Sequence, residues 1–199
     1  MSISIKKLGL VLLVFAMVSC GETSNDGDAY YNAGKFEEAI KAYDNVLSTK
    51  PKDSNALYKR GRSYEEIGDF DNAEKDFLLA LENDSKNTQI MLSLSSLYHK
   101  NKNHNRALLY AEYAVEVPGA PAMAYFMKAR ALHQLGNTDE ALKEYGAAIK
   151  MDDNFGQAYY NRGLLKIATD KKSSGCEDLR IAEKLNIEAA SEVLAKYCN

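Results

Sequence analysis

Apolar residues along most of the chain recur with the spacing of amphipathic helices. Ala39, Tyr43, Val46 and Leu47 fall at i, i+4, i+7 and i+8, which places them on one face of a helix. No segment alternates apolar and polar residues with period two over any length, so no strands are expected. The pattern predicts an all-α fold.

The helical pattern returns every 34 residues, and small residues mark three of its positions. The three columns are Gly27, Gly61, Ser95, Ala129 and Gly163; Ala39, Ala73, Ala107, Ala141 and Gly175; and Val46, Ala80, Ala114, Ala148 and Ala182. All but Val46 are Gly, Ala or Ser, as expected where two helix backbones approach closely. The pattern therefore predicts that each unit forms two closely packed helices.

A recurring glycine divides each unit into its two helices. Gly34, Gly68 and Gly136 share this position, and Lys102 and Asp170 occupy it in the third and fifth units. Glycine favours the left-handed conformation that ends a helix. We expect a sharp turn at each of these places.

Five such units fit the chain, at residues 20–53, 54–87, 88–121, 122–155 and 156–189. One hairpin cannot bury its apolar face alone, so the units should stack into a solenoid. A last helix over about Glu188 to Tyr197, with residues 190–199 forming its end, has apolar residues on one side and suits a terminal cap.

The repeat resembles the tetratricopeptide repeat, most clearly in ALYKRGRSYEEIGDFDNAEKDFLLALEND, Ala56 to Asp84. The resemblance covers residues 20–189 and implies a right-handed superhelical solenoid whose first helices line a concave groove. The family's groove positions correspond here to Tyr58, Lys59, Arg62, Leu92, Ser96, His99, Phe126, Met127, Arg130, His133, Tyr160 and Asn161. The resemblance implies that a protein or peptide segment binds at this surface.

Aromatic residues beside arginines suit an extended peptide with apolar and acidic side chains. Such residues also line helical arrays that bind nothing, and the aromatics would equally serve an accessory subunit that contacts glycan in a polysaccharide- or wall-processing complex. The carboxylate clamp of cytosolic co-chaperone repeats is not expected, because its positions hold Tyr58, Arg62, Ser93, Met123 and Met127.

The N-terminus has the pattern of an export signal. Lys6 and Lys7 precede an apolar run over residues 8–18, which as a helix would cross only about half of a bilayer core. The ending Met17-Val18-Ser19-Cys20 resembles a bacterial lipobox, although Leu is usual where Met17 stands. We expect residues 1–19 to be removed and Cys20 to be lipidated; an ordinary cleaved signal and an uncleaved anchor are the alternatives.

A lipid on Cys20 would attach the chain to a membrane of the bacterial cell envelope, most simply the outer membrane facing the periplasm or the cell surface. The resemblance to tetratricopeptide lipoproteins implies a scaffold for envelope assemblies. The formal net charge of −3 would become −5 after removal of residues 1–19, which contain two lysines and no acid. This mildly acidic chain is not expected to bind nucleic acid.

No catalytic motif is recognisable, so we expect no enzyme and no cofactor. His99 and His133 occupy the same position in adjacent units, but two histidines make a poor metal site because three or four ligands are needed. The NDGD stretch at residues 25–28 lacks the acid of a calcium loop twelve residues on, where Phe36 stands. A cap near Asp26 for the first helix is the simpler interpretation.

Cys176 and Cys198 form the even pair that remains in an exported chain. They lie ten to twelve residues on either side of the turn expected near Asn186, so antiparallel helices would bring them to the same level. We predict a disulfide between them; two reduced cysteines that pack as small apolar residues are the alternative.

Overall fold

The computed structural model describes residues 23–198, which form eleven α-helices and no strand. The helices are α1 (Ser24–Asn32), α2 (Phe36–Thr49), α3 (Ser54–Glu66), α4 (Phe70–Asn83), α5 (Thr88–Lys100), α6 (His104–Glu116), α7 (Ala122–Gln134), α8 (Thr138–Met151), α9 (Gly156–Ala168), α10 (Lys172–Lys184) and α11 (Ala189–Tyr197). The all-α prediction is confirmed. The predicted signal over residues 1–19 and the predicted lipid site Cys20 lie outside the described residues.

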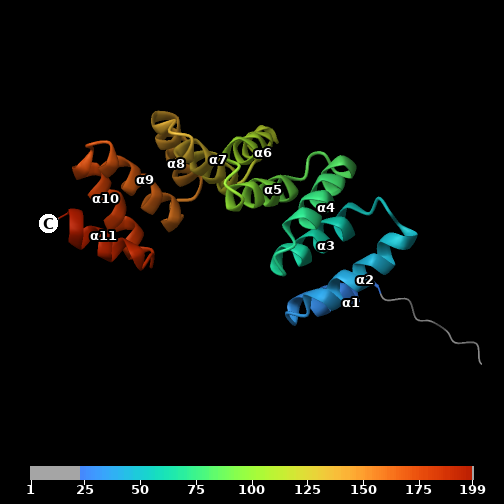
Figure 1. The fold of residues 1–199 in the computed structure, drawn as a ribbon. Coiled ribbons are helices and arrows are strands. Elements are labelled where there is room, and N and C mark those ends of the chain that lie inside the picture. Colours follow the sequence, from blue (N-terminus) through green and yellow to red (C-terminus); the bar gives the residue numbers. More distant parts are fainter. Residues whose placement is uncertain (1–22, 199) are drawn as a thin grey trace, which may run out of the picture.

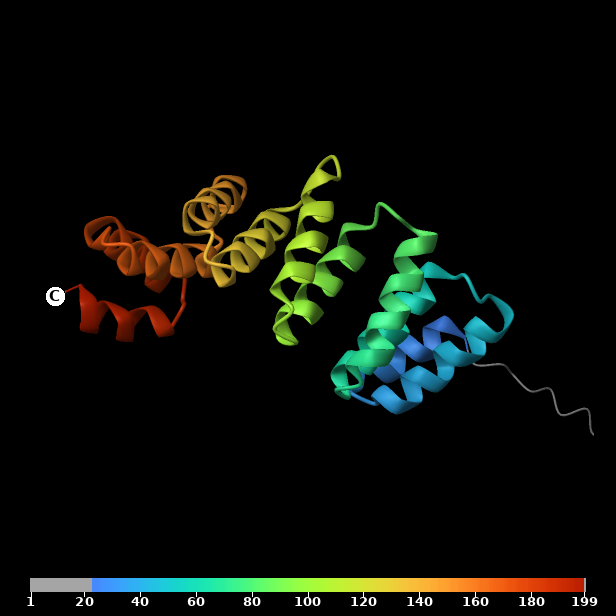
Figure 2. The same ribbon diagram turned by 45° about the horizontal axis from the view of Figure 1, so that its top comes forward.

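Successive helices pair into hairpins that follow one another in a single curved row (Figure 1). The extensive packing is between helices next to each other in the chain, together with α1 against α3 and α5 against α7. Figure 2 shows the same row from a second direction, with α11 beside the last hairpin. The fold is therefore the predicted solenoid with a terminal helix. Within the described residues, no helix has both the length and the apolar character needed to cross a membrane.

The turn inside each hairpin has the predicted left-handed residue. The φ angle of this residue is 72° at Gly34, 80° at Gly68 and 82° at Gly136. The two non-glycine residues at the same position also have positive φ angles, 57° at Lys102 and 58° at Asp170. Backbone bonds close these turns; the N–H of Asp69, for example, donates to the carbonyl of Tyr64 at 2.9 Å. The turn is thus set by backbone bonding, and glycine only makes it less costly.

Small residues occur where the two helices of a hairpin touch. A Cβ on Gly61 would lie 2.8 Å from the ring of Phe77, and one on Gly163 would lie 2.9 Å from the carbonyl oxygen of Gly175. Ala73 is fully buried at the same kind of contact. The small-residue columns therefore permit the close backbone approach that the sequence predicts.

An ion pair recurs at one position of three hairpins, and sequence reasoning missed it. The guanidinium of Arg60 donates two bonds of 2.7 Å to Asp76, whose side chain is 5% exposed. Arg162 binds Asp178 in the same way at 2.7 Å, 102 residues further along the chain. The third pair joins Lys128 to Glu144 at 3.3 Å. The ion pair joins the two helices of a hairpin, so it is a structural part of the repeat.

Each end of the solenoid is stabilised by a local interaction. Thr23 is the N-cap of the first helix, and its N–H and hydroxyl both donate to Asp26, at 2.6 and 2.9 Å. The cap therefore lies at Thr23, three residues before the expected Asp26, because Asp26 supplies the reciprocal carboxylate. At the other end a disulfide joins Cys176 to Cys198, with their Cα atoms 5.7 Å apart. The turn between α10 and α11 contains Asn186 at a φ of 63°.

Candidate functional site

The first helices of successive hairpins line three neighbouring cavities. An N-terminal cavity of about 280 Å³ lies between α1 and α3. A central cavity of about 580 Å³ is lined from α3, α5 and α7, and a C-terminal cavity of about 580 Å³ is lined mainly from α7 and α9. Tyr58 and Arg62 are shared by the first two cavities, and Phe126 and Arg130 by the last two. The three cavities therefore form one continuous groove.

All the predicted groove residues except Tyr160 line one of these cavities. They are Tyr58, Lys59, Arg62, Leu92, Ser96, His99, Phe126, Met127, Arg130, His133 and Asn161. Tyr160 instead packs against a buried cluster that includes Leu179 and Ala190, and α11 contributes to that cluster. Tyr160 is therefore half-buried beside the end of the groove.

The groove also contains residues that sequence reasoning did not select. Gln89, Met123 and Gln157 are exposed, line the cavities and stand 34 residues apart. The repeat period was the signal that could have found them. Asp28 and Tyr31 stand 34 residues before Arg62 and Glu65, so the same period also indicates their place in the groove.

Phe126 and Met127 form the wall of the groove and belong to the core. Their exposed fractions are 5% and 6%. The ring of Phe126 lies 4.8 Å from that of Phe155 and 5.9 Å from that of Tyr145, measured between centroids. Because neighbouring rings enclose it, Phe126 offers little free surface to a ligand.

Cations in the N-terminal part of the groove are paired with carboxylates. Lys59 donates to Asp28 at 2.5 Å, and the Tyr43 hydroxyl donates to the same carboxyl group at 2.6 Å. Burial alone would raise the pKa of Asp28, but these two bonds outweigh it and the pKa is lowered. Asp28 and Lys59 therefore neutralise each other at neutral pH.

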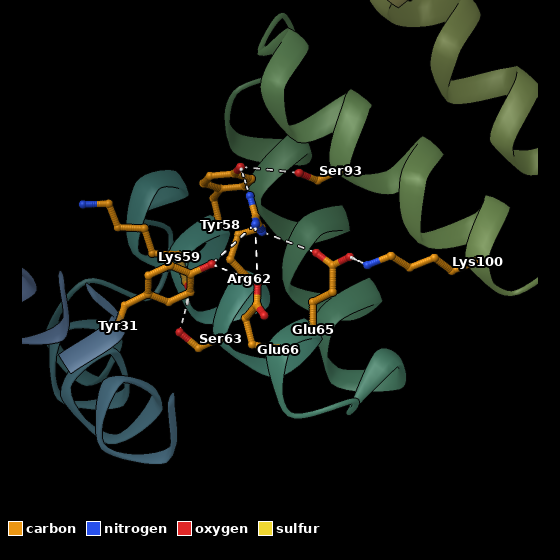
Figure 3. Close-up of polar contacts among 9 residues, drawn as sticks. All are labelled: Tyr31, Tyr58, Lys59, Arg62, Ser63, Glu65, Glu66, Ser93 and Lys100. Atoms are coloured by element: carbon orange, nitrogen blue, oxygen red, sulfur yellow. Dashed lines mark hydrogen bonds and ion pairs between the residues drawn. The ribbon is translucent and has the colours of Figure 1, made fainter. Parts of the chain in front are cut away.

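Arg62 lies at the centre of a polar cluster between α1, α3 and α5 (Figure 3). Its guanidinium donates to the hydroxyls of Tyr58 and Tyr31 at 3.3 and 3.4 Å. It also lies 3.4 Å from Glu65 and 3.7 Å from Glu66. Lys100 in turn donates to Glu65 at 2.6 Å. This half of the groove therefore satisfies its own charges.

Arg130 in the C-terminal part has a different environment. Its guanidinium stands 5.7 Å from the centroid of the Phe126 ring and donates to the sulfur of Met127 at 3.6 Å. Among residues 23–198, no carboxylate forms an ion pair with it. His99 and His133 line the same cavity. Arg130 is thus a half-buried cation among neutral groups.

The two histidines are uncharged at neutral pH. Burial lowers the pKa of His133. Burial, followed by the charges of Arg130 and His104, lowers the pKa of His99 to about 4. Over residues 23–198 there is no group of three or more His, Cys, Asp or Glu side chains placed to hold a metal ion. The chemistry of this cavity is therefore hydrogen bonding around one fixed positive charge.

Comparisons with known proteins agree with the repeat. The tetratricopeptide repeat model matches residues 25–88 and 58–124, and a second model of the same repeat matches residues 129–167. The mitochondrial import receptor subunit TOM70 of Saccharomyces cerevisiae is 32% identical over 136 residues, which are 68% of this chain and 20% of that protein. The human protein O-mannosyl-transferase TMTC1 is 25% identical over 141 residues, 69% of this chain and 16% of that protein. The chain spans a fifth or less of these two relatives.

Among solved structures, YrrB superposes with a TM-score of 0.72 at 24% identity, covering 86% of this chain and 89% of that one. YrrB is described as a tetratricopeptide repeat protein with an unusual peptide-binding site. At this identity the likeness concerns the fold. With repeat models matched over most of its length and the hairpins stacked as that repeat requires, this chain belongs to the tetratricopeptide repeat family.

Proposed function

We propose that this protein is a lipid-anchored scaffold of a bacterial cell envelope, which binds an extended peptide or protein segment in its concave groove. Tetratricopeptide repeat chains are scaffolds for protein–protein interaction, and the peptide-binding site named for YrrB supports this use of the fold. The observation that carries the proposal is the continuous groove lined from α3, α5, α7 and α9. The activity in the name of TMTC1 belongs to that much longer protein, and we propose no enzymatic role here.

An extended segment suits the groove better than a glycan. Sugar rings bind by stacking on exposed aromatic faces, but Phe126 is 5% exposed and neighbouring rings and Arg130 surround it. Exposed side chains of the groove, Gln89 and Gln157, are instead amides that can bond a peptide backbone. A peptide is therefore the proposed ligand.

The proposed anchor is a lipid on Cys20 after removal of residues 1–19. The lysines, apolar run and lipobox-like ending of the N-terminus support it. Metabolic labelling with a fatty-acid probe should mark the protein, and Cys20→Ala should abolish the label. Unchanged labelling of the variant would reject the anchor and leave the groove proposal intact.

The groove is tested by photo-crosslinked capture from membranes, followed by binding assays with captured segments and with glycan fragments. A triple variant that changes only exposed groove residues, Gln89→Ala, Met123→Ala and Gln157→Ala, should lose most capture. Its matched control changes exposed residues on the second helices, Lys75→Ala, Leu79→Ala and Leu109→Ala, and should keep it. Both should retain helical circular dichroism. Equal capture by the two variants, or binding of glycan fragments alone, would reject the proposal.

A further inference from the structure

Positive charges along the groove differ in whether the protein itself neutralises them. Lys59 is paired with Asp28, and Lys100 with Glu65. Arg62 lies within ion-pair distance of two glutamates. Of the lysines and arginines that line the three cavities, Arg130 alone has no carboxylate partner among the described residues.

Arg130 contacts two residues of its own helix and also lines the groove. The Phe126 ring and the Met127 sulfur hold one side of the guanidinium. A guanidinium has five N–H donors and stays charged at all relevant pH values. Met127 is the one protein acceptor that these donors reach among residues 23–198, so most of them are available to a ligand.

The surroundings of Arg130 favour an anion over any other ligand group. The C-terminal cavity has no acidic residue in its lining, and its other polar groups are neutral amides, a tyrosine and the two histidines. Because the site is half-buried, a carboxylate there would interact more strongly than on an open surface. A ligand cation would meet only repulsion.

Arg130 lies where the central and C-terminal cavities meet, so the groove continues on both sides of it. A chain end would leave one of these cavities empty, whereas an internal residue can place backbone in both. We propose that the groove selects partner segments by seating the carboxylate of an internal Asp or Glu side chain on Arg130. This inference rests on the proposed function and specifies the chemistry of its partner.

The experiment measures fluorescence anisotropy of short labelled peptide pools against the full chain in detergent. The pools have randomised apolar and neutral polar residues and blocked termini, and they differ only in a central Glu or Gln. Wild type should bind the Glu pool about tenfold more tightly than the Gln pool, as expected for a charge-assisted hydrogen bond. Arg130→Gln should bind both pools equally, at the wild-type level for the Gln pool.

Two matched variants serve as controls. Arg130→Lys keeps the charge and should keep part of the preference for Glu. Lys75→Gln removes an exposed positive charge from a second helix outside the groove, and should leave the preference unchanged. A Gln pool with a free C-terminal carboxylate should bind no better than the blocked Gln pool.

Each contrary result points to a different failure. If Arg130→Gln weakens both pools equally, Arg130 acts through packing and the inference is wrong, while peptide binding stands. If the pool with a free C-terminus matches the Glu pool, the carboxylate comes from a chain end and the internal-residue inference is wrong. If wild type binds neither pool, both the inference and the proposed peptide function fail.

Discussion

The second and third hairpins have the same left-handed turn but join their helices by different chemistry. In α3–α4 the contact is the buried pair of Arg60 and Asp76, with Asp44 of the preceding hairpin also bonded to Arg60 at 2.6 Å. The equivalent residues of α5–α6, 34 positions on, are Leu94 and Tyr110. Leu94 is fully buried, and Tyr110 stacks on Tyr98 at 5.5 Å. The repeat therefore needs a well-filled contact at this place and accepts either an ion pair or an apolar pair.

The largest effect should follow from breaking the ion pair on one side. Asp76→Ala leaves the half-buried Arg60 without its main partner and should lower the free energy of unfolding by about 3–5 kcal/mol. Replacing both residues with leucine, as an approximation to the third hairpin, should recover most of this loss. Urea titration followed by circular dichroism measures both variants. A double variant no more stable than Asp76→Ala would mean that the two contacts are not interchangeable.

The fifth hairpin sharpens the comparison, because it repeats the ion pair at the end of the row. There the disulfide of Cys176 and Cys198, separated by 22 residues, adds a covalent closure. Cys198→Ser should lower the free energy of unfolding by about 3 kcal/mol through the greater entropy of the unfolded chain. Mass spectrometry of the unreduced, alkylated protein should detect no free thiol at either position. Two alkylated cysteines there would contradict the bridge.

The third hairpin also carries a histidine, His99, at the position where the second hairpin has Glu65. The pKa of His99 is lowered to about 4 by burial, then by Arg130 and His104. Between pH 6.5 and 4 the unfolded chain therefore binds more protons at His99 than the folded chain does. The free energy of unfolding falls as the pH is lowered through this range. The loss should be roughly 1 kcal/mol from pH 6.5 to 5 after allowance for solvent screening.

The control for this pH effect is His99→Gln, which should reduce the slope of stability against pH over the same range. Thermal or urea unfolding at several pH values measures it. An unchanged slope would assign the acid sensitivity to other groups.

The smallest effect concerns the turns. Gly68 and Lys102 hold the same left-handed position in the second and third hairpins, at φ angles of 80° and 57°. Lys102→Gly removes the steric cost of a side chain there but increases the freedom of the unfolded chain, so it should stabilise by about 0.5–1 kcal/mol. The reverse change, Gly68→Lys, should destabilise by a similar amount. Urea midpoints that move in the same direction for both would refute this account.

Most of the fold could be predicted because it depends on residues that recur. Gly34, Gly68 and Gly136 marked the turns, and the small-residue columns marked the helix contacts. The ion pair also recurs, at Arg60, Lys128 and Arg162, but charged residues on helices are usually solvated, so the column carried no clear meaning from sequence alone. The 34-residue period thus predicts where a residue lies in a hairpin better than it predicts which residue it contacts.

The site was predictable in outline only. Family positions placed both Arg62 and Arg130 in the groove. Their environments differ because Glu65 and Glu66 lie within ion-pair distance of Arg62 but not of Arg130, and Lys100 pairs with Glu65. Tyr160 packs against a cluster to which α11 contributes, and the period gave no sign of this contact because α11 lies outside the repeats. Whether these residues bind a partner stays a prediction that the variants above test.

The order of helix contacts has a consequence for synthesis of the chain. Because each helix packs extensively only against helices one or two places away in the chain, a hairpin can fold while later residues are still being synthesised. The bridge between Cys176 and Cys198 is different, since it joins α10 to the residue that follows α11, beyond the fifth hairpin. It can form only after α11 has been synthesised, so the oxidised form would distinguish molecules with a finished terminal helix from chains that stop before it.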